Sequence, residues 1–555
     1  MSVRESNLVP YGHDIVVATT QASINATMQQ YLAGIREPET IGCYIADDRG
    51  EPVPIALADL VAQAGVDPFS VSDDADPATD RGLQALIGAR FMMGFKASLG
   101  IPASSAGVPE VVTLGDDGGT ATFNMMCSDF TVVQLVPGGG YSSVPTWFNR
   151  SQDPNAPWVF SSLVYLRLAL VDPTVYASLT PDVRARIEAI GNAPFSIQQL
   201  LLDIDDATLE TQPTISGVRP GTPLATVLGE TFLGAYFAQM RAEGKPVFNV
   251  VVQESAGPVS TLTVTHVDKE ACPLTDPSDP PTDAQRELTT LNYLCAANGA
   301  TPAPVTKFGW NWFDDGDTSA EGVIAVNRLS FAKTLKAQLD TYVAGLCFAP
   351  YVNIPMVGLT ADINWSLTPG QMPTTMTLPP TGPQLLGYAY SGSSGDRAGL
   401  DGDIAQMDLS PSFSFAATFS GNTLTLAREL IVFLRLQHLQ TSVQGNIIDL
   451  RVTDTYTLTV TDRGQVAATP VSVTEDKSQQ LGTTPFLDFF TNLNDMLADI
   501  ENRARALTAP MNVDPPLSAV QDFVFPGGNT FAFSTVGFSD YGDLVTHIDY
   551  TAPRR

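Results

Sequence analysis

The sequence has few cysteines and no long apolar run, and each shortage excludes a class of protein. Five cysteines are spread over 555 residues without a CxxC pair, which favours reduced, buried thiols over a disulfide framework. No run of about 18 apolar residues exists, so no segment is expected to cross a bilayer as a helix. The opening MSVRESNLVPYGHD lacks the apolar core of a signal peptide. We therefore expect synthesis in the cytoplasm, with unconventional export left open.

Basic residues are also scarce. The chain has 29 Lys and Arg against 59 Asp and Glu, a formal net charge of −30 at pH 7. Nucleic-acid binding needs clustered basic residues, and the one adjacent pair is Arg554-Arg555. We therefore expect no nucleic-acid partner, and an anionic membrane would repel the chain at long range. Charged residues make up only 16 %, so Thr, Ser, Asn and Gln cover much of the surface, which favours strands with a polar face.

Sequence motifs of catalysis and metal binding are missing as well. The histidines at 13, 266, 438 and 547 form no HExxH and no paired metal spacing, and there is no GxSxG. The acidic stretch from Asp314 to Glu321 departs from the EF-hand spacing, which favours a solvated turn. We predict no catalytic residue, no metal site and no cofactor, and that the chain is not an enzyme.

The chain does contain one amphipathic helix pattern at two separate positions. INATMQQYLAGI (24–35) and LKAQLDTYVAGL (335–346) carry apolar residues at the same helical steps. These positions include Ile24, Met28, Leu32, Leu335, Leu339 and Val343.

Two longer helices are predicted, and both start with Thr-Pro. Thr222-Pro223 opens a helix over 222–244, and Thr484-Pro485 opens one over 485–507, which is predicted to be the longest of the chain. The apolar face of the second includes Phe486, Phe489, Phe490, Leu493 and Leu497.

The order of elements is similar in the two halves. Each half runs from a short strand and an amphipathic helix through many alternating strands to a Thr-Pro helix and then apolar strands. In the first half, residues 116–119 read as a hairpin turn between VVTL and TATFNMM. Because strands come in runs, the order predicts an α+β fold with antiparallel sheets. We expect two elongated rolls, each a long curved antiparallel sheet wrapped around a long amphipathic helix.

A Pro- and Asp-rich stretch separates the two predicted rolls. CPLTDPSDPPTD (272–283) is the clearest linker. Thr282 and Gln285 suggest a capping box for a helix over 283–297. The sequence therefore predicts a first unit at 1–271, a linker with a short helix at 272–304, and a second unit at 305–555.

Trp310 and Trp312 are predicted to lie on one face of a strand. We favour a packed anchor at the junction of the two units over an aromatic belt that touches a membrane or partner.

The apolar helix faces have two interpretations. They can be solid core, which is the commoner role of such faces, or they can line a gap between sheet and helix. Such a gap would be a long apolar groove suited to an acyl chain.

Three stretches resemble a known family. YGHDIVVATTQASINATMQQYL (11–32) resembles the start of OrfX-type accessory proteins of clostridial neurotoxin gene clusters, with His13 in place of their aromatic residue and Ile-Asn in the helix. The segment 308–335, with Ile-Ala-x-Asn-Arg ahead of a helix, is similar to their mid-chain return, and 523–538 is similar to their C-terminal strands. The resemblance implies a member of the tubular lipid-binding (TULIP) superfamily, whose sheets roll around long helices and bind lipid without catalysis.

We therefore predict a non-catalytic protein that binds lipid or another apolar small molecule, as an accessory to a toxin or secretion system. The alternative is a structural or assembly protein with solid cores that acts through a protein partner or self-association. An enzyme, such as a lipid hydrolase, ranks third because no set of reactive residues supports it.

Overall fold

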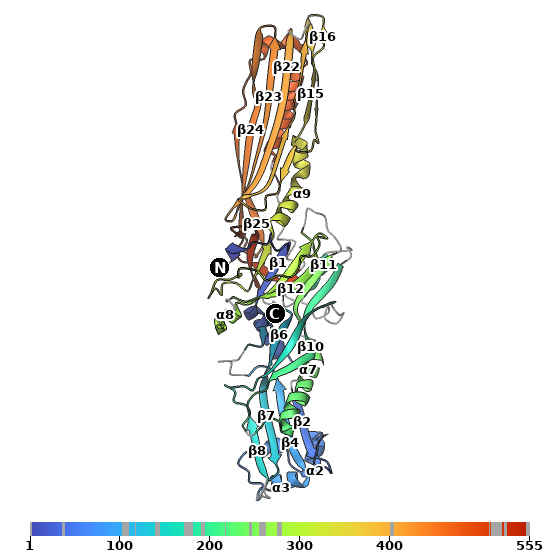
Figure 1. Cartoon of the computed structure of the whole chain (residues 1–555), viewed down its shortest axis with the longest axis vertical. Helices are drawn as coiled ribbons and strands as arrows, with labels where there is room; N and C mark the ends of the chain where they lie inside the picture. Colours follow the sequence, from blue (N-terminus) through green and yellow to red (C-terminus); the bar gives the residue numbers. More distant parts are fainter. Residues whose placement is uncertain are drawn as a thin grey trace.

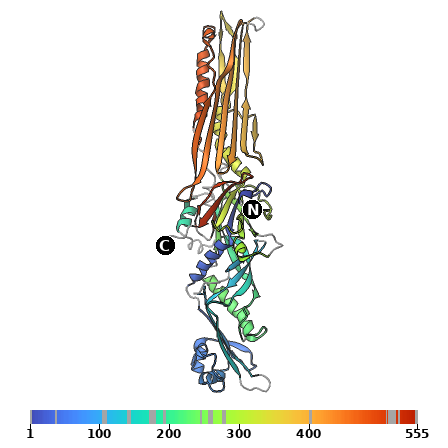
Figure 2. The same ribbon diagram turned by 90° about the vertical axis from the view of Figure 1, so that its left-hand side faces the viewer.

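The computed structural model of the chain is an elongated α+β molecule with its first strand near the middle (Figures 1 and 2). It describes residues 3–35, 39–102, 110–116, 118–138, 145–170, 181–189, 195–216, 218–242, 247–254, 262–274, 280–399, 404–509, 511, 524–526 and 530–550. Nearly all strand pairings in this part of the chain are antiparallel, as predicted.

A sheet at the centre contains strands from both halves of the chain. Its order is β12 (Val264–Cys272), β13 (Thr290–Ala297), β1 (Ile15–Thr20), β14 (Gly322–Val326), β30 (Leu544–Tyr550) and β28 (Phe531–Phe533), and β29 (Gly537–Phe538) pairs with β30. β1 is fully buried, and its Ile15 lies opposite Cys295 on one side and Val326 on the other. The boundaries at 271 and 305 stay a prediction, but the two predicted units share this sheet.

The loop that contains the paired tryptophans covers one face of the central sheet. Residues 310–312 contain bends and no strand, so the predicted strand at this position is wrong. Trp310 and Trp312 are buried in an apolar cluster with Leu8, Phe308 and other side chains from both halves. The packed-anchor interpretation is therefore confirmed, and the exposed aromatic belt is wrong.

Two sheets form the lower part of the molecule in Figure 1. The first has the order β3 (Pro52–Ile55), β2 (Glu39–Ala46), β4 (Phe91–Leu99), β7 (Cys127–Val136) and β8 (Thr146–Ser151). The second has the order β27 (Val524–Pro526), β11 (Val247–Glu254), β10 (Phe195–Thr211), β9 (Phe160–Leu170), β6 (Thr120–Met125) and β5 (Val112–Leu114). β5 and β6 pair antiparallel with Leu114 opposite Ala121, as the predicted hairpin requires, and residue 117 of the predicted turn lies outside the described part.

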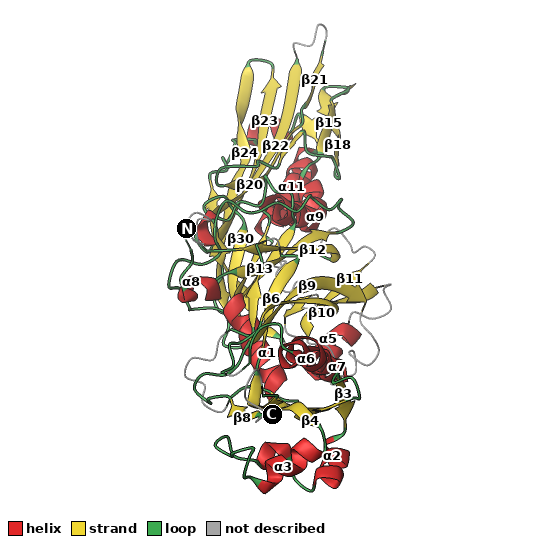
Figure 3. Cartoon of the chain, turned by 60° about the horizontal axis from the view of Figure 1, so that its bottom comes forward, coloured by secondary structure: helices red, strands yellow, loops and turns green. Residues whose placement is uncertain are grey.

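Helices accompany these lower sheets. Figure 3, which brings the lower end forward, shows α1 (Gln21–Ala33), α6 (Pro223–Val227) and α7 (Leu233–Ala242) next to the strands. The predicted helix at 222–244 forms with Thr222 as its cap, but a π-helical turn at Leu228–Phe232 joins α6 to α7. Residues 243–244 lie outside the described part. The remaining short elements are α2 (Leu57–Ala64), α3 (Arg81–Gly88), α5 (Pro181–Ala189), and 3-10 turns at Val3–Glu5 and Pro68–Ser70.

The upper part in Figure 1 is a long sheet with helices against it. The strand order is β19 (Thr375–Thr377), β20 (Gln384–Ser391), β22 (Ala405–Ser420), β23 (Thr423–His438), β24 (Thr441–Val460) and β25 (Val466–Asp476), and β21 (Ser394–Ala398) pairs with β22. β15 (Ala349–Asn353) pairs with β18 (Asn364–Thr368), and α9 (Arg328–Leu346) leads into them. Alternate residues of β23 are buried, because one face of the sheet packs on the helices.

The predicted helix at 485–507 is wrong as one continuous element. The chain forms α10 (Thr484–Leu487), a short strand β26 (Phe490–Thr491), α11 (Leu493–Arg505) and a 3-10 turn at Ala506–Thr508. β26 pairs in parallel with β17 (Thr360–Asp362), which also pairs with β16 (Met356–Val357). Asn492 then adopts a left-handed backbone with φ of 66° before α11 begins. The break exists because the backbone at 490–491 pairs with a distant strand. α9, with 19 residues, is the longest helix in the described part.

The predicted helix over 283–297 is correct only at its start. Thr282 and Gln285 form the capping box, but α8 (Asp283–Glu287) ends after five residues. Residues 290–297 form β13, and all eight are buried between β12 and β1. Pairing on both edges and burial on both faces outweigh the local helical propensity of this segment.

Candidate functional site

The residues predicted to line an apolar groove are buried together. They are Ile24, Met28, Leu32, Leu335, Leu339, Val343, Phe486, Phe489, Phe490, Leu493 and Leu497, and all but the partly buried Leu497 have at most 6 % of their surface exposed. They all belong to or pack against one continuous apolar cluster. None of them lines the three cavities described below. An open groove along these helices therefore stays a prediction.

Polar side chains of α1 form hydrogen bonds with the backbone of β5, which is an edge strand of its sheet. The Asn25 side chain donates to the Val112 carbonyl at 3.0 Å and accepts from the Val112 amide at 2.7 Å. One turn earlier, Gln21 accepts from the Leu114 amide at 2.7 Å. The Ile24-Asn25 pair thus has a structural role: Ile24 enters the core while Asn25 fixes the helix to the sheet.

Asn327 and Arg328 begin α9 and tie it to the centre of the molecule. The Asn327 side chain caps the helix by accepting from the Leu329 amide and donates to the His13 carbonyl, each at 2.9 Å. The buried Arg328 guanidinium donates to the carbonyls of Tyr541, Gly382 and Gln384 at 2.7–2.9 Å. These contacts join the long upper sheet to the central one.

Asp543 binds the N-terminal segment next to the start of α9. Its carboxylate accepts from the Ser6 hydroxyl at 2.9 Å, the Leu8 amide at 2.7 Å and the Arg328 amide at 3.0 Å. Burial raises the pKa of Asp543 to about 6, against the lowering effect of these hydrogen bonds. This anchor fixes residues 6–8 beside the largest of the three described cavities.

That cavity, which we call the junction cavity, has a volume of about 680 Å³ and lies where the β22–β23 turn meets the central sheet. Its lining is Val3, Arg4, Phe419, Ser420, Gly421, Asn422, Thr535, Val536, Gly537, Phe538, Ser539, Asp540, Val545 and His547. Phe538 and Val545 are buried at its base, whereas Arg4 and Asp540 are exposed at its edge. An apolar base with a polar edge suits an amphipathic molecule.

Aromatic packing shapes the base of the junction cavity. Phe538 contacts Phe419 at a centroid distance of 5.2 Å and Phe331 of α9 at 5.6 Å. The Arg328 guanidinium lies 5.5 Å from the centre of the Phe419 ring. His547 contacts Thr535, with 2.6 Å between Nδ1 and the hydroxyl, and burial lowers its pKa, so the imidazole is neutral at pH 7.

A second cavity lies between a lower sheet and its helix. It measures about 320 Å³ and is lined by Thr40, Ile41, Gly42, Cys43, Tyr44, Pro54, Ile55, Ala56, Phe95, Thr231 and Ala235. The Phe95 ring packs directly over Gly42, where an added Cβ would lie 2.4 Å from a ring carbon. Of the three described cavities, this is the one that lies between a sheet and a helix, and none of the predicted groove residues lines it.

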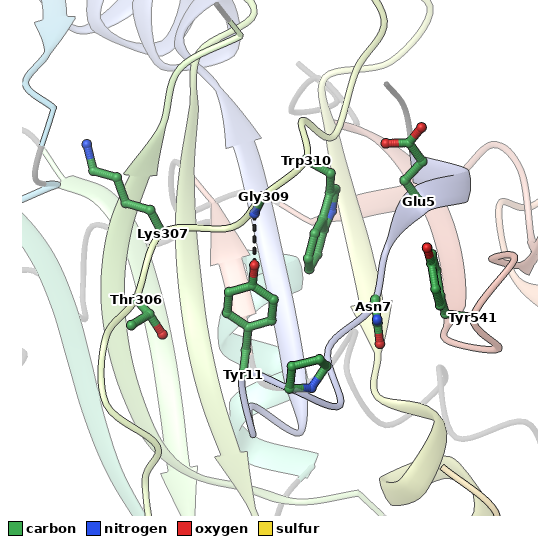
Figure 4. A pocket seen from close by; sticks show the side chains of 9 residues that line it. Glu5, Asn7, Tyr11, Thr306, Lys307, Gly309, Trp310 and Tyr541 are labelled. Atoms are coloured by element: carbon green, nitrogen blue, oxygen red, sulfur yellow. Dashed lines mark hydrogen bonds between the residues drawn. The ribbon is translucent and has the colours of Figure 1, made fainter. Parts of the chain in front are cut away.

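A third, more polar pocket of about 460 Å³ lies beside the N-terminal segment (Figure 4). Tyr11 accepts a hydrogen bond from the Gly309 amide at 2.9 Å and contacts Trp310 edge-on with centroids 5.2 Å apart. Glu5, Lys307 and Tyr541 are exposed around it. Its charged lining makes it a poorer place for an acyl chain than the junction cavity.

Histidine and cysteine are the side chains whose surroundings bear most on reactive chemistry. No three His, Cys, Asp or Glu side chains are grouped to hold a metal ion in the described residues. The cysteines are buried and free, and burial raises the pKa of Cys43, Cys272 and Cys295 to about 12, which suppresses thiolate chemistry. His266 lies 3.8 Å from Asp268, and His438 stacks on Phe489 with ring centroids 3.6 Å apart.

The junction cavity was not predicted from the sequence. Its residues come from the N-terminus, a hairpin turn at 420–422 and the last strands, so no local spacing connects them. The sequence gives only a weak signal for this cavity. Ser-Gly-Asn at 420–422 and Thr-Val-Gly-Phe at 535–538 mark chain reversals and nothing more.

Together these features define an elongated α+β protein of mainly antiparallel sheets, with one cavity at the junction of its sheets and another between a sheet and a helix. No helix of the described chain is long and apolar enough to cross a membrane.

Comparison with known proteins gives remote structural likeness only. No family model matches the sequence, and no curated protein matches it. P47 from Clostridium botulinum A2 is similar in structure with a TM-score of 0.44 and 10 % identity over 97 % of each chain. P47 of C. botulinum E1 has a TM-score of 0.43 and 9 % identity over 98 % of this chain and 100 % of its own. A lipopolysaccharide binding protein has a TM-score of 0.30 and 10 % identity over 98 % and 100 %. These values assign neither a family nor a ligand.

Proposed function

We propose that the chain is a TULIP-like protein of two rolls that binds a lipid or another apolar small molecule without catalysis. Its role would be that of an accessory to a toxin or secretion system, as the sequence resemblance implies. The junction cavity is the observation that supports binding most directly, because it combines buried Phe538 and Val545 with an exposed polar edge.

The size of the cavity fits part of an amphipathic molecule. Ligand pockets commonly measure about 300–1,000 Å³ and are mostly apolar with a few polar groups. The junction cavity falls in this range at about 680 Å³. We propose that an acyl chain lies against Phe419 and Phe538 while its polar end remains near Arg4.

Filling the junction cavity tests this proposal. Gly537 lines the cavity, and an added Cβ would meet its nearest neighbour, the Gly421 carbonyl oxygen, at an ordinary 3.5 Å. The backbone at this position therefore accepts a side chain, and we expect Gly537→Leu to fold and to occupy ligand space. Gly345→Leu is the matched control, because Gly345 lies on α9 with open space around its Cβ position.

The readout is native mass spectrometry of purified protein after growth in a lipid-containing host. We expect co-purified lipid on the natural chain and on Gly345→Leu, and loss of most of it from Gly537→Leu. Retention of the same lipid by Gly537→Leu would remove the junction cavity from the proposal, and the absence of any small molecule from all three proteins would reject lipid binding.

One observation favours the alternative role of a structural or assembly protein. The side chains predicted to line the grooves are buried in one continuous cluster, as they would be in solid cores. That role predicts protein without extractable lipid and a stable oligomer in sedimentation velocity.

A further inference from the structure

A strap without helix or strand, residues 306–313, covers one face of the central sheet. Its Phe308, Trp310 and Trp312 are at most 8 % exposed and pack in one apolar cluster with Leu294 of β13. Ring centroids lie 4.7 Å apart between Phe308 and Trp310 and 5.7 Å apart between Trp310 and Trp312. Figure 4 shows the strap where it borders the third pocket. The strap therefore closes over the sheet mainly through its aromatic side chains.

Few hydrogen bonds hold the strap closed. Within the described part of the chain, no backbone-to-backbone hydrogen bond joins residues 306–313 to another segment. Side chains make the connections to the end of β12 instead: the Cys272 thiol donates to the Trp310 carbonyl at 3.4 Å, and the Asn311 side chain donates to the Leu274 carbonyl at 2.7 Å. A segment held in this way can open without breaking a strand ladder.

Closure of the strap also buries polar groups without partners. The indole N–H groups of Trp310 and Trp312 are buried and have no acceptor among the described residues. Water satisfies an exposed indole N–H, so its burial without an acceptor costs stability. Opening of the strap removes this cost, which makes the strap an element that can be released.

A buried carboxyl group lies under the strap on β12. Glu270 lies opposite Asn292 of β13, and the two residues are 2 % and 0 % exposed. The Asn292 amide donates to Oε2 of Glu270 at 3.3 Å, whereas Oε1 of Glu270 and Oδ1 of Asn292 have no partner in the described chain. A proton on Glu270 supplies the missing donor, because a carboxylic acid and an amide can each donate to the other. An ionised carboxylate here is a buried charge with unpaired oxygens.

Groups of the strap act directly on this carboxyl group. Burial raises the pKa of Glu270 from 4.5 to about 7, and the hydrogen bond from Asn292, the Phe308 amide and the Lys307 ammonium lower it by less. Phe308 and Lys307 belong to the strap, so the strap lies over the carboxyl group. Lys307 is exposed, so water screens its effect.

The other titratable groups that the structure describes nearby add no countercharge for an ionised Glu270. Burial raises the pKa of Cys272, on the same strand, to about 12, so its thiol is neutral. His13 packs on Phe308 with ring centroids 6.3 Å apart, and burial lowers its pKa, so it is neutral at pH 7. Asp268, two residues before Glu270 on β12, carries a charge of the same sign.

We propose that Glu270 is a pH-sensitive latch for this strap: with its proton it pairs with Asn292 and the strap stays closed, and without the proton the strap opens and uncovers the aromatic cluster. Opening brings the carboxylate and both indole groups into water, where the pKa of a glutamate is near 4.5. The opening constant therefore rises with pH between about 4.5 and 7 and levels off outside this range. This inference goes beyond ligand binding and does not depend on it.

Cys272 is a native probe of the opening, since it is 6 % exposed and its thiol contacts the strap at the Trp310 carbonyl. Its labelling by a dipyridyl disulfide, which reacts with thiols in weak acid, can be followed by mass spectrometry of the digested chain. Between pH 5 and pH 7.5, we expect the labelling rate of the natural chain to rise roughly tenfold or more relative to Glu270→Gln, because glutamine keeps a donor for Asn292 at every pH. Equal rates in the two chains would overturn the proposal.

Cys295 is the internal control for this experiment. It lies on the opposite face of β13, fully buried, and burial raises its pKa to about 12, as it does for Cys272. We expect Cys295 to be labelled at the same slow rate in both chains. A rise at Cys295 that matches the rise at Cys272 would show general unfolding and would contradict a local latch.

Lys307→Gln gives a second test at an exposed position outside the core. Lys307 lowers the pKa of Glu270, so its loss makes the ionised carboxylate less stable under the closed strap. We expect Cys272 to be labelled faster than in the natural chain at pH 8 and at the same rate at pH 5. Lys307 also lowers the pKa of Cys272, so its loss makes the thiol itself less reactive and cannot cause a faster rate.

Unchanged or slower labelling of Lys307→Gln at pH 8 would contradict the latch. These readouts need no lipid, so failure of this inference is distinguishable from failure of the proposed function.

Discussion

At the scale of single residues, a buried ion pair holds the chain that follows α11. Arg428 and Asp454 project from neighbouring strands into the core, with 2.5 Å between Nη1 and Oδ2, and their side chains are only 0 % and 4 % exposed. Arg428 also donates to the carbonyls of Leu507 at 2.8 Å and Ala509 at 3.2 Å. Tyr342 donates to the Leu507 carbonyl at 3.1 Å. These polar groups satisfy the carbonyls at the end of the helix inside an apolar roll.

Removal of one member of this pair should destabilise the protein strongly. Arg428→Met leaves Asp454 buried without its partner, and we expect a loss of about 3–5 kcal/mol in the free energy of unfolding. The double variant Arg428→Met/Asp454→Leu should lose less, because no isolated charge remains and Tyr342 still serves Leu507. Urea unfolding followed by circular dichroism measures both. Equal losses would show that the charge pairing does not matter here.

Asp543 gives the central anchor a pH dependence with a defined sign. Its pKa is raised by burial from 3.8 to about 6 in the folded chain, so the folded state binds the proton more tightly. The stabilising contribution of this group is complete below about pH 4 and is lost as the pH rises through about 6.

Substitution of Asp543 by asparagine removes this titration. We expect the unfolding temperature of the natural chain to exceed that of Asp543→Asn by the largest margin at pH 4. This margin should be smaller at pH 7. Thermal unfolding at both values checks it, and the comparison cancels the titration of the other acidic groups. A difference that grows with pH would contradict the raised pKa.

At the scale of elements, regular periodicity was predictable and interrupted periodicity was not. The apolar spacing of Ile24, Met28 and Leu32 correctly predicts α1, and the alternation of apolar residues over 421–439 and 445–473 correctly predicts β23 and β24. The apolar face at 485–507 continues across a break, because Phe490 faces the core both as a strand residue and as part of a helical pattern. Its pairing with Ala361 depends on a residue far away in sequence, which no local pattern reveals.

The break before α11 predicts a specific tolerance at Asn492. This residue has φ of 66°, which Gly accepts and a β-branched residue does not. Asn492→Val should unfold with about 1–2 kcal/mol less stability than Asn492→Gly, and both lose the same contact with Asp362. Urea unfolding of the two variants gives the difference directly. Equal stability would mean that residues 485–507 form an uninterrupted helix in solution.

At the scale of the whole molecule, the central sheet makes the two halves depend on each other. β1, from the first half, lies between β13 and β14, and β27, from the second half, pairs with β11 of the first. The junction cavity likewise combines residues 3–4 with 419–422 and 535–547. Composition and strand order predicted the fold class, but these long-range pairings, and the cavity that they create, have no signature within either half.

The shared sheet predicts that the halves do not fold alone. Expressed by itself, 305–555 lacks β1, so the buried strand β14 would present an open apolar edge. We expect this fragment to aggregate or to unfold without cooperativity, and co-expression with 1–304 to restore a soluble complex. Size-exclusion chromatography and thermal unfolding check this. A monomeric 305–555 that unfolds at the temperature of the full chain would establish independent domains instead.

The central claim is that this acidic, elongated molecule carries an apolar ligand at the junction of its sheets. Native mass spectrometry of the intact chain and of Gly537→Leu tests it most directly. The account predicts a lipid-sized mass on the natural chain that is largely lost when leucine fills the junction cavity. A natural chain that carries no lipid-sized mass after mild desolvation, whichever lipid-containing host it was purified from, would contradict it.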